Sequence, residues 1–268
     1  MRDDPTQFVG SIPSFYDKGL GPVIFAGPAD YVARRIAALK PSRVLETAGG
    51  TGIVTQRLRA ALSTDAHIVA TDLNAGMLEI SRAKFGPDAG VSLEVADATA
   101  LPFGDGEFDV VVCQFGVMFF PDKDKGYREA RRVLKREGRY LFSVWDAHAH
   151  NPFGRIISDV LRNAFDTDAP PFMNVPFGYA SIDAIKASLQ ANGFGELRAD
   201  VVRLSGPLED FNFFADGLVF GSPVVDQLRA RGVDPEKLKS EVVKSLQNEL
   251  GAVKSTPLQF VLFEASPA

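Results

Sequence analysis

Apolar and polar residues alternate in a regular order through the first half of the chain. Short apolar segments bounded by turn residues predict five strands, at 43–47, 67–72, 91–96, 108–113 and 139–145. Between them, apolar residues at helical spacing predict three helices, at 53–62, 75–84 and 123–134, and Gly138 is expected to end the last one. Strands that alternate with helices in this way indicate an α/β fold with a doubly wound, mostly parallel sheet.

After residue 146 the alternation is less regular. Helices are predicted at 151–165, 181–192 and 235–250, and strands at 195–204 and 258–264. Residues 168–177 are rich in proline and aromatic residues, and a second aromatic group lies between Phe211 and Phe220. We expect one domain over residues 1–268, with a core at 28–145, an N-terminal segment at 1–27, and insertions at 146–180 and 205–256.

Composition and charge narrow the classes of partner. The hydrophobic fraction of 46% is ordinary for a globular protein, and the net charge is −5. Five basic residues recur at helical spacing, and we interpret them as a solvated helix face: Arg128, Arg131, Arg132, Lys135 and Arg136. No nucleic-acid partner is therefore expected, because phosphate binding needs a dense basic surface.

Several further expectations concern location and chemistry. The first residues lack the apolar core of a secretory signal, and the apolar stretch 110–120 is too short to span a bilayer. The single cysteine, Cys113, excludes an internal disulfide. We expect a cytoplasmic protein with no integral membrane segment and no metal site, and the oligomeric state stays open.

A glycine-rich loop follows the first predicted strand. The segment 46–52, Glu-Thr-Ala-Gly-Gly-Thr-Gly, leads directly into a helix, so its small residues let the backbone turn sharply and approach a ligand. Gly50 and Gly52 lack the third glycine of a nicotinamide-cofactor loop. They fit the alternative pattern acidic-x-small-x-Gly-x-Gly, with Glu46 and Ala48. A tight turn without a ligand is the other interpretation of this loop.

Two aspartates end the next two predicted strands. The carboxylate of Asp72 can accept both hydroxyls of a ribose, and that of Asp97, beside Ala98, can accept from an adenine amine. Each also has a local interpretation, as a helix N-cap and as a turn residue. Because parallel strands end at one edge of a sheet, their joint occurrence favours nucleoside binding.

These segments together resemble the motifs of class I S-adenosylmethionine-dependent methyltransferases. The runs 44–52, 72–73, 97–98 and 108–113 carry the resemblance, and 114–122 and 131–138 are similar to the ubiquinone/menaquinone-biosynthesis methyltransferase group. The resemblance implies a Rossmann-like sheet of seven strands with an antiparallel last strand, helical insertions over the active site, and S-adenosylmethionine as cofactor. It also implies a set of cofactor-binding residues: Tyr16, Glu46, Ala48, Gly49, Gly50, Gly52, Asp72, Leu73, Met77, Asp97, Ala98, Gln114 and Phe115.

Two features depart from that family or stay ambiguous. Ala48 stands where the family usually has a glycine, and Glu46 where aspartate is commoner. The segment 14–22 resembles the family's lid, in which Tyr16 would close over the methionine end of the cofactor. The alternative is a helix that packs Phe15 and Tyr16 into the core.

The acceptor side is predicted from aromatic residues and two histidines. Phe119, Phe172 and Phe213 are expected to line an apolar pocket, and His148 and His150 are weak candidates for a general base. The predicted function is methyl transfer to a small, aromatic or apolar metabolite. An NAD(P)-dependent oxidoreductase and a non-catalytic S-adenosylmethionine-binding protein are the alternatives.

Overall fold

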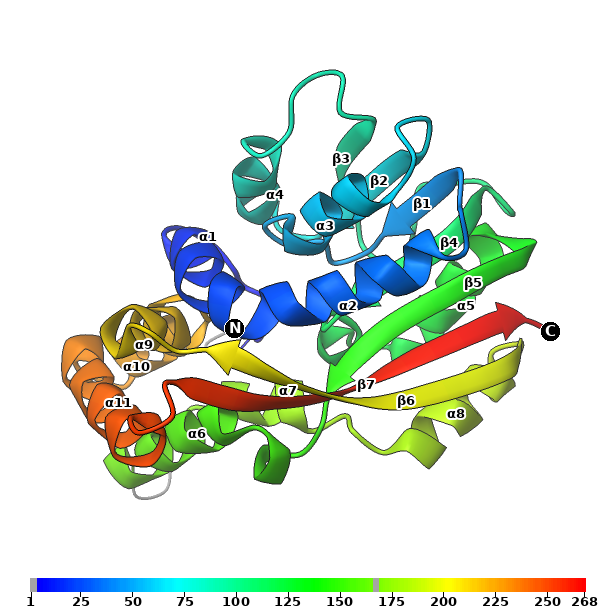
Figure 1. Cartoon of the computed structure of the whole chain (residues 1–268). Coiled ribbons are helices and arrows are strands. Elements are labelled where there is room, and N and C mark those ends of the chain that lie inside the picture. Colours follow the sequence, from blue (N-terminus) through cyan, green and yellow to red (C-terminus); the bar gives the residue numbers. More distant parts are fainter. Residues whose placement is uncertain (1–3, 166–168) are drawn as a thin grey trace.

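A seven-stranded sheet runs through the protein in the order β3-β2-β1-β4-β5-β7-β6 (Figure 1). The computed structural model describes residues 4–165 and 169–268. The strands are β1 (Arg43–Glu46), β2 (His67–Asp72), β3 (Val91–Val95), β4 (Phe108–Gln114), β5 (Leu134–Trp145), β6 (Phe194–Pro207) and β7 (Ser255–Pro267). Strands β1 to β5 pair in parallel, and β7 lies antiparallel between β5 and β6. The predicted sheet with its antiparallel last strand is confirmed.

The sequence of each strand matches its place in the sheet. Strand β4, at the centre, buries Val110, Val111 and Val112 almost completely, as a strand covered on both faces must. Strand β3, at the edge, is only partly buried, and its last residue, Val95, is exposed. The alternating pattern of this strand therefore reflects its edge position.

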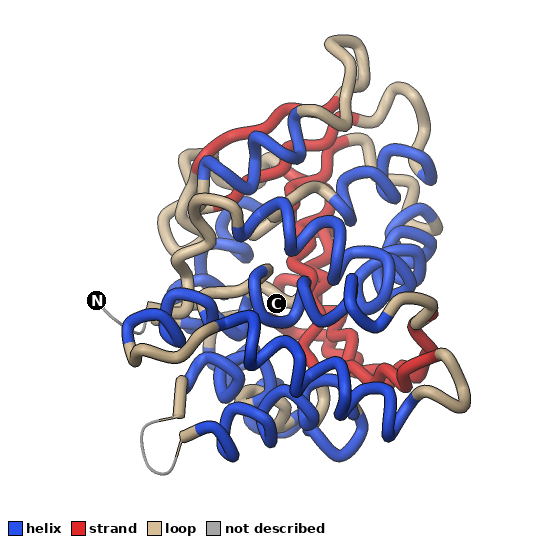
Figure 2. Tube along the Cα trace, turned by 90° about the vertical axis from the view of Figure 1, so that its left-hand side faces the viewer, coloured by secondary structure: helices blue, strands red, loops and turns tan. Residues whose placement is uncertain are grey.

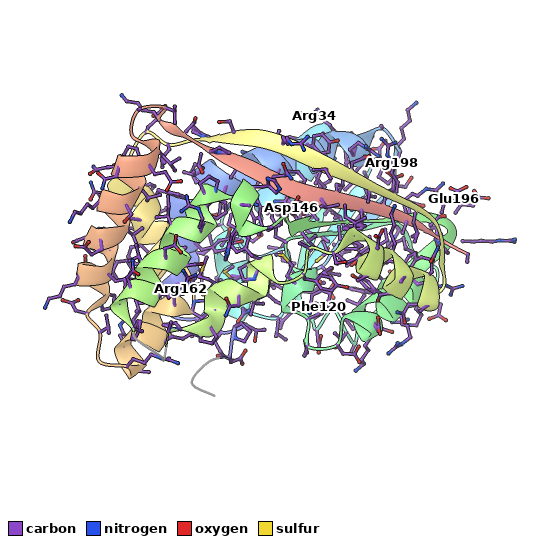
Figure 3. The ribbon with its side chains drawn as sticks, turned by 90° about the horizontal axis from the view of Figure 1, so that it is seen from below. Arg34, Phe120, Asp146, Arg162, Glu196 and Arg198 are labelled. Atoms are coloured by element: carbon purple, nitrogen blue, oxygen red, sulfur yellow. The ribbon has the colours of Figure 1, made fainter. Side chains whose placement is uncertain are left out.

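Helices cover both faces of the sheet. On one face α2 packs against α3, and on the other α5 contacts α8. The helices that connect the parallel strands, or precede or follow them, are α2 (Ala26–Ala37), α3 (Ile53–Ala61), α4 (Ala75–Arg82), α5 (Lys123–Val133) and α8 (Ile182–Ala191). Figure 3, from below, shows β6 and β7 as a long antiparallel pair with α8 beside them.

The boundary between α5 and β5 differs from the prediction. Helix α5 ends at Val133, and Gly138 lies inside β5 instead of ending a helix. The pairing of β4 with β5 shifts register between Phe108 and Val110, so the chain bulges at this point. A Cβ on Gly138 would lie 3.0 Å from the Asp109 carbonyl oxygen, which is why a glycine fits there.

The predicted basic helix face is consequently divided. Lys135 and Arg136 belong to β5, and Arg132 points inward to a network with Glu129 and Asp105. Arg132 also donates to the carbonyl oxygens of Leu101 and Phe103. This half-buried side chain therefore also holds the loop before β4.

A group of helices lies beyond the carboxyl ends of the parallel strands. Figure 1 shows α1, α6, α9, α10 and α11 together at one end of the sheet, and Figure 2 views the molecule from that side. These elements are α1 (Ile12–Phe15), α6 (Pro152–Ala164), α9 (Phe211–Phe220), α10 (Val224–Ala230) and α11 (Pro235–Leu250), and the short helix α7 (Asn174–Phe177) follows α6 in the chain. Four short or irregular helical segments complete the chain: η1 (Tyr16–Phe25), η2 (Val117–Phe119), η3 (His148–His150) and η4 (Pro171–Met173).

The N-terminal segment joins this group through a glycine contact. Segment η1 is a π-helix with Pro22 inside it. Proline has no backbone N–H and cannot donate the hydrogen bond that an α-helix needs. A Cβ on Gly19 would lie 2.6 Å from the Cα of Gly217 in α9, so only glycine permits this approach. Among residues 4–165 and 169–268, none of the helices combines the length and apolar composition needed to span a bilayer.

Candidate functional site

A cavity lies where β1, β2, β3 and β4 end, between the sheet and the helices beyond it. Its position is the edge at which open α/β sheets bind ligands. Twelve of the residues predicted from sequence line it: Tyr16, Ala48, Gly50, Asp72, Leu73, Met77, Asp97, Ala98, Gln114, Phe115, Phe119 and Phe172. The three predicted loops therefore converge on one space.

The loop after β1 has a positive φ angle at three alternate residues. Ala48, Gly50 and Gly52 have φ angles of 52°, 57° and 81°. Glycine adopts this left-handed region freely, whereas for alanine it costs about 1 kcal/mol. Ala48 therefore adopts a conformation that glycine would adopt without this cost. Gly52 is the N-cap of α3, and a Cβ there would collide with Ser81 at 2.3 Å.

Glu46 lies behind this loop and does not line the cavity. Its side chain is 1% exposed, and its Oε2 accepts a hydrogen bond of 2.7 Å from the Thr55 hydroxyl. A Cβ built on Gly49 would lie 3.3 Å from the Glu46 carboxyl group. Burial raises the pKa of Glu46 to about 8, the Thr55 bond opposes the shift, and the charge of Asp72 adds to it.

Asp72 connects the glycine loop to the cavity. Its Oδ2 accepts from the Gly50 amide at 2.9 Å, and its Oδ1 accepts from the Asn74 amide at 2.8 Å. Burial raises the pKa of this carboxyl, while those hydrogen bonds lower it. The sequence left Asp72 or Asn74 as the N-cap of the helix that follows, and the structure gives this position in α4 to Asn74.

Asp97 sits in a turn and lines the cavity at the same time. Its Oδ1 accepts from both the amide and the hydroxyl of Thr99 at 2.8 Å. These bonds fix the carboxylate at the end of β3, next to Ala98. The turn and the ligand interpretations are therefore compatible, because two bonds to one oxygen orient the whole group.

The end of β4 places two further residues at the cavity. Gln114 donates from Nε2 to the Phe25 carbonyl oxygen at 3.4 Å, and its buried Oε1 has no partner among the described residues. Phe115 has a φ of 55° and stacks on Trp145 with centroids 4.0 Å apart. Trp145 also lines the cavity. The sequence analysis missed it, although it ends the strand beside β4.

The N-terminal segment closes one side of the cavity. Tyr16 stacks on Phe25 with centroids 4.8 Å apart, whereas the neighbouring Phe15 is partly exposed. The alternative that packs both residues into the core is therefore wrong for Phe15. Burial and the charges of Asp72 and Asp17 raise the pKa of the Tyr16 phenol, which keeps it protonated.

Aromatic rings form another part of the cavity lining, the aromatic wall. Phe119 and Phe172 stack at 5.9 Å, and Phe8 packs edge-on against both. Phe213 does not line the cavity: it is 45% exposed, and the next residue, Phe214, is buried instead. Helix α9 is apolar around most of its circumference, so its sequence did not show which phenylalanine faces inward.

Neither predicted histidine lines the cavity. The His148 ring packs against Phe177 at 4.3 Å, and burial lowers its pKa, whereas His150 is exposed. The segment that carries them is fixed by the buried Asn151, which donates to the carbonyl oxygens of Asp146 and Gln259 at 2.9 Å. The expectation that these histidines face the acceptor is therefore not supported.

The charges at the cavity have one sign. Within residues 4–165 and 169–268, its lining includes no lysine, arginine or histidine, and its ionisable side chains are Tyr16, Asp72 and Asp97. The same residues include no group of three or more His, Cys, Asp or Glu side chains that could hold a metal ion. The site therefore suits a ligand with positive charge and hydroxyl or amine donors, attached to an apolar partner.

Comparison with known proteins agrees with this geometry. Residues 45–142 match the family model described as a methyltransferase domain. The chain is 42% identical over 108 residues to a demethylmenaquinone methyltransferase of Clavibacter sepedonicus, covering 40% of this chain and 43% of that protein. It is also 42% identical over 113 residues to the ubiquinone/menaquinone biosynthesis C-methyltransferase UbiE of Stenotrophomonas maltophilia, covering 41% and 44%. The matched part thus spans less than half the length of these relatives.

A solved structure extends the similarity of fold to almost the whole chain. Phosphoethanolamine N-methyltransferase 2 of Haemonchus contortus, solved with S-adenosyl-L-methionine, covers 98% of this chain with a TM-score of 0.63 at 17% identity, over 58% of its own chain. Residues 45–142 therefore match a methyltransferase domain, and the fold around them is that of a solved methyltransferase. The relatives that match this part in sequence include a demethylmenaquinone methyltransferase and a ubiquinone/menaquinone biosynthesis C-methyltransferase.

Proposed function

We propose that this protein transfers a methyl group from S-adenosylmethionine to a neutral, electron-rich aromatic molecule, with a hydroquinone as the favoured acceptor. The observation that carries the proposal is that the lining residues fall into two halves by their chemistry. One half comprises the glycine loop with Asp72 and Asp97, and the other comprises aromatic rings. The names of the sequence relatives support the choice of a quinone-like acceptor.

The residues of the first half fit the cofactor. Asp72, 7% exposed, presents a carboxylate for the two ribose hydroxyls, and Asp97 presents one for the adenine amine. Leu73 and Met77 line the same space and can flank the adenine ring. The backbone at Ala48 and Gly50, which line the cavity, would hold the methionine part through peptide groups other than the Gly50 amide, because that amide donates to Asp72. When bound, the cofactor supplies a methyl group on a positively charged sulfur.

The second half would orient the acceptor and exclude water. Methyl transfer is a direct displacement, so alignment of the attacking atom with the methyl carbon provides much of the acceleration. Phe119 and Phe172 offer ring faces for stacking, and Phe8 and Tyr16 cover the space from the N-terminal side. Burial of the reacting atoms among rings also strengthens their interaction with the sulfonium charge.

The lining also argues against charged acceptors and against base catalysis by histidine. An acceptor with a phosphate or carboxylate would find no cation among the described lining residues. Tyr16 stays protonated, and Asp72 and Asp97 are assigned to the cofactor. The acceptor must therefore react without a base from the described lining residues, as a hydroquinone can. A ring carbon would form its bond to the methyl carbon while the methyl–sulfur bond breaks, and the proton displaced from that ring carbon would pass to solvent.

Product formation with a panel of acceptors tests the proposal. The purified protein is incubated with S-adenosylmethionine and either a naphthohydroquinone, a simple phenol, an aromatic amine or phosphoethanolamine, and S-adenosylhomocysteine is quantified by mass spectrometry. We expect the fastest release with the hydroquinone and none above background with phosphoethanolamine. The reverse order would contradict the acceptor class. Cofactor binding without turnover on any acceptor would favour the non-catalytic alternative.

A further inference from the structure

Two acidic side chains contact consecutive residues of the glycine loop from different sides. The Glu46 carboxyl lies against Gly49, and Asp72 accepts the amide hydrogen of Gly50 at 2.9 Å. Asp72 lines the cavity, whereas Glu46 is separated from it by the loop. The cavity is thus bordered by one carboxylate that a ligand can touch and one that it can influence only through its charge.

The surroundings of Glu46 do little to stabilise a negative charge. The Thr55 hydroxyl is its one hydrogen-bond donor among the described residues, and no described lysine, arginine or histidine pairs with it. The titratable groups that face it are Asp72, from the end of β2, and Cys113, from β4. Burial raises the pKa of the Cys113 thiol to about 12, so that group is neutral and adds no positive charge.

A buried carboxyl with one donor, a carboxylate neighbour and no cation favours its protonated form. Burial raises its pKa to about 8, which agrees with this geometry. A positive charge that arrives on the other side of the loop reverses the balance, because it attracts the ionised form. The cofactor carries such a charge on its sulfur, and the product, a thioether, does not.

We propose that Glu46 holds a proton in the ligand-free protein and releases it when a sulfonium-bearing ligand fills the cavity, so that the cofactor binds more tightly than its product. The O–H bond of the carboxyl breaks, the proton passes to solvent, and the carboxylate remains opposite the sulfonium. Loss of the methyl group removes the positive charge, and Glu46 takes a proton back from solvent. Glu46 is thus a positioning residue that distinguishes the two ligands by charge; this role rests on the proposed function.

Calorimetric titration in two buffers of different ionisation enthalpy measures the proton directly. The wild-type protein is titrated at pH 7.0 with S-adenosylmethionine and with S-adenosylhomocysteine, and the number of protons released is taken from the difference in heat. We expect release of up to about one proton with the cofactor, since a group of pKa near 8 is mostly protonated at pH 7. We expect clearly less with the product. Both ligands carry the same amino-acid end, so the difference reports the sulfur charge.

The Glu46→Gln variant assigns the proton to its residue. Glutamine has the shape of the protonated side chain and can still accept from Thr55, so the loop should keep its structure. We expect the extra proton release to disappear, affinity for the cofactor to fall roughly tenfold at pH 8, and affinity for the product to change less than twofold. The exposed Glu79→Gln variant is the matched control and should behave as wild type.

Each outcome bears on a separate claim. Cofactor binding without buffer-dependent heat, or equal proton release with both ligands, overturns the role of Glu46 and leaves the proposed function standing. Unchanged proton release in Glu46→Gln also overturns it. The wild-type comparison remains decisive if the variant does not fold. No heat with either ligand overturns both this inference and the proposed function.

Discussion

The ring of Phe115 stacks face to face on the indole of Trp145, with centroids 4.0 Å apart and planes 4° from parallel. Phe115 has a φ of 55°, and this left-handed backbone conformation costs a residue with a side chain about 1 kcal/mol. An aromatic pair contributes about 0.5–1.5 kcal/mol beyond its burial, which is enough to offset this strain. The stack therefore fixes the residue at the end of β4 beside the candidate cofactor site.

Trp145 provides a direct optical signal, because it is the single tryptophan of the chain and lines the cavity. Addition of S-adenosylmethionine should change its fluorescence in a saturable way. The measurement is a titration at fixed protein concentration. Trp145→Phe should abolish the signal while keeping calorimetric binding. A binding isotherm by calorimetry with no fluorescence change in the wild type would place the ligand away from this indole.

Phe172 and Phe213 make a matched pair for the acceptor pocket. Phe172→Ala should raise the acceptor KM severalfold, because Phe172 lines the cavity and stacks on Phe119, and should leave cofactor affinity almost unchanged. Phe213→Ala should behave as wild type, since Phe213 lies outside. Steady-state kinetics with the best acceptor measures both. Equal effects of the two substitutions would show that the aromatic wall does not hold the acceptor.

His148 should be dispensable for the chemical step. Its ring does not line the cavity but packs on Phe177, which does, and burial lowers the pKa of the imidazole. His148→Gln should therefore leave kcat within about twofold and keep the shape of the pH–rate profile. The acidic limb of kcat against pH is the informative region. If His148→Gln lost that limb and its kcat fell a hundredfold, the result would show that His148 acts as a base.

Glu46 should make the ligand-free protein less stable as the pH rises. Burial raises the pKa of Glu46 from 4.5 to about 8, so between these values the folded state holds a proton that the unfolded chain has lost. The stabilisation is complete below pH 4.5 and is lost as the pH rises through 8, with a slope of at most about 1.4 kcal/mol per pH unit.

Urea unfolding at pH 5, 6.5 and 8 measures this dependence in the wild type and in Glu46→Gln. The variant cannot lose the proton, so its free energy of unfolding should fall less over the range and should exceed that of the wild type at pH 8. Parallel curves for the two proteins would mean that Glu46 titrates normally in the fold.

Much of the fold could be predicted from the order of apolar segments. The strand that ends at Asp72 and the helix that begins at Pro235 are found within a residue or two of their predicted bounds, since local pattern decides both. The end of α5 could not be predicted, because the bulge opposite Phe108 depends on pairing with a strand distant in sequence. Gly138 looked like a helix terminator and is in fact required by that bulge.

The candidate site divides in the same way. Asp72 and Asp97 were predictable, because every parallel strand ends at the same edge of the sheet. The aromatic wall was predicted only in part, since Phe119 and Phe172 line it but Phe8 was not recognised. The ring of Phe8 contacts that of Tyr16, but the residues around Phe8 show little periodicity from which this contact could be predicted. The buried Asn151 was also missed, because a single polar residue in a loop carries no pattern.

A crystal structure of the protein with S-adenosylhomocysteine would show whether the three loops bind one adenosyl ligand. We expect density in the cavity, with the ribose hydroxyls on the carboxylate of Asp72, the adenine beside Asp97 and Leu73, and the sulfur near Phe115. Density for the ligand elsewhere on the protein, or its absence from crystals grown at saturating concentration, would contradict the convergence of these loops on one adenosyl ligand.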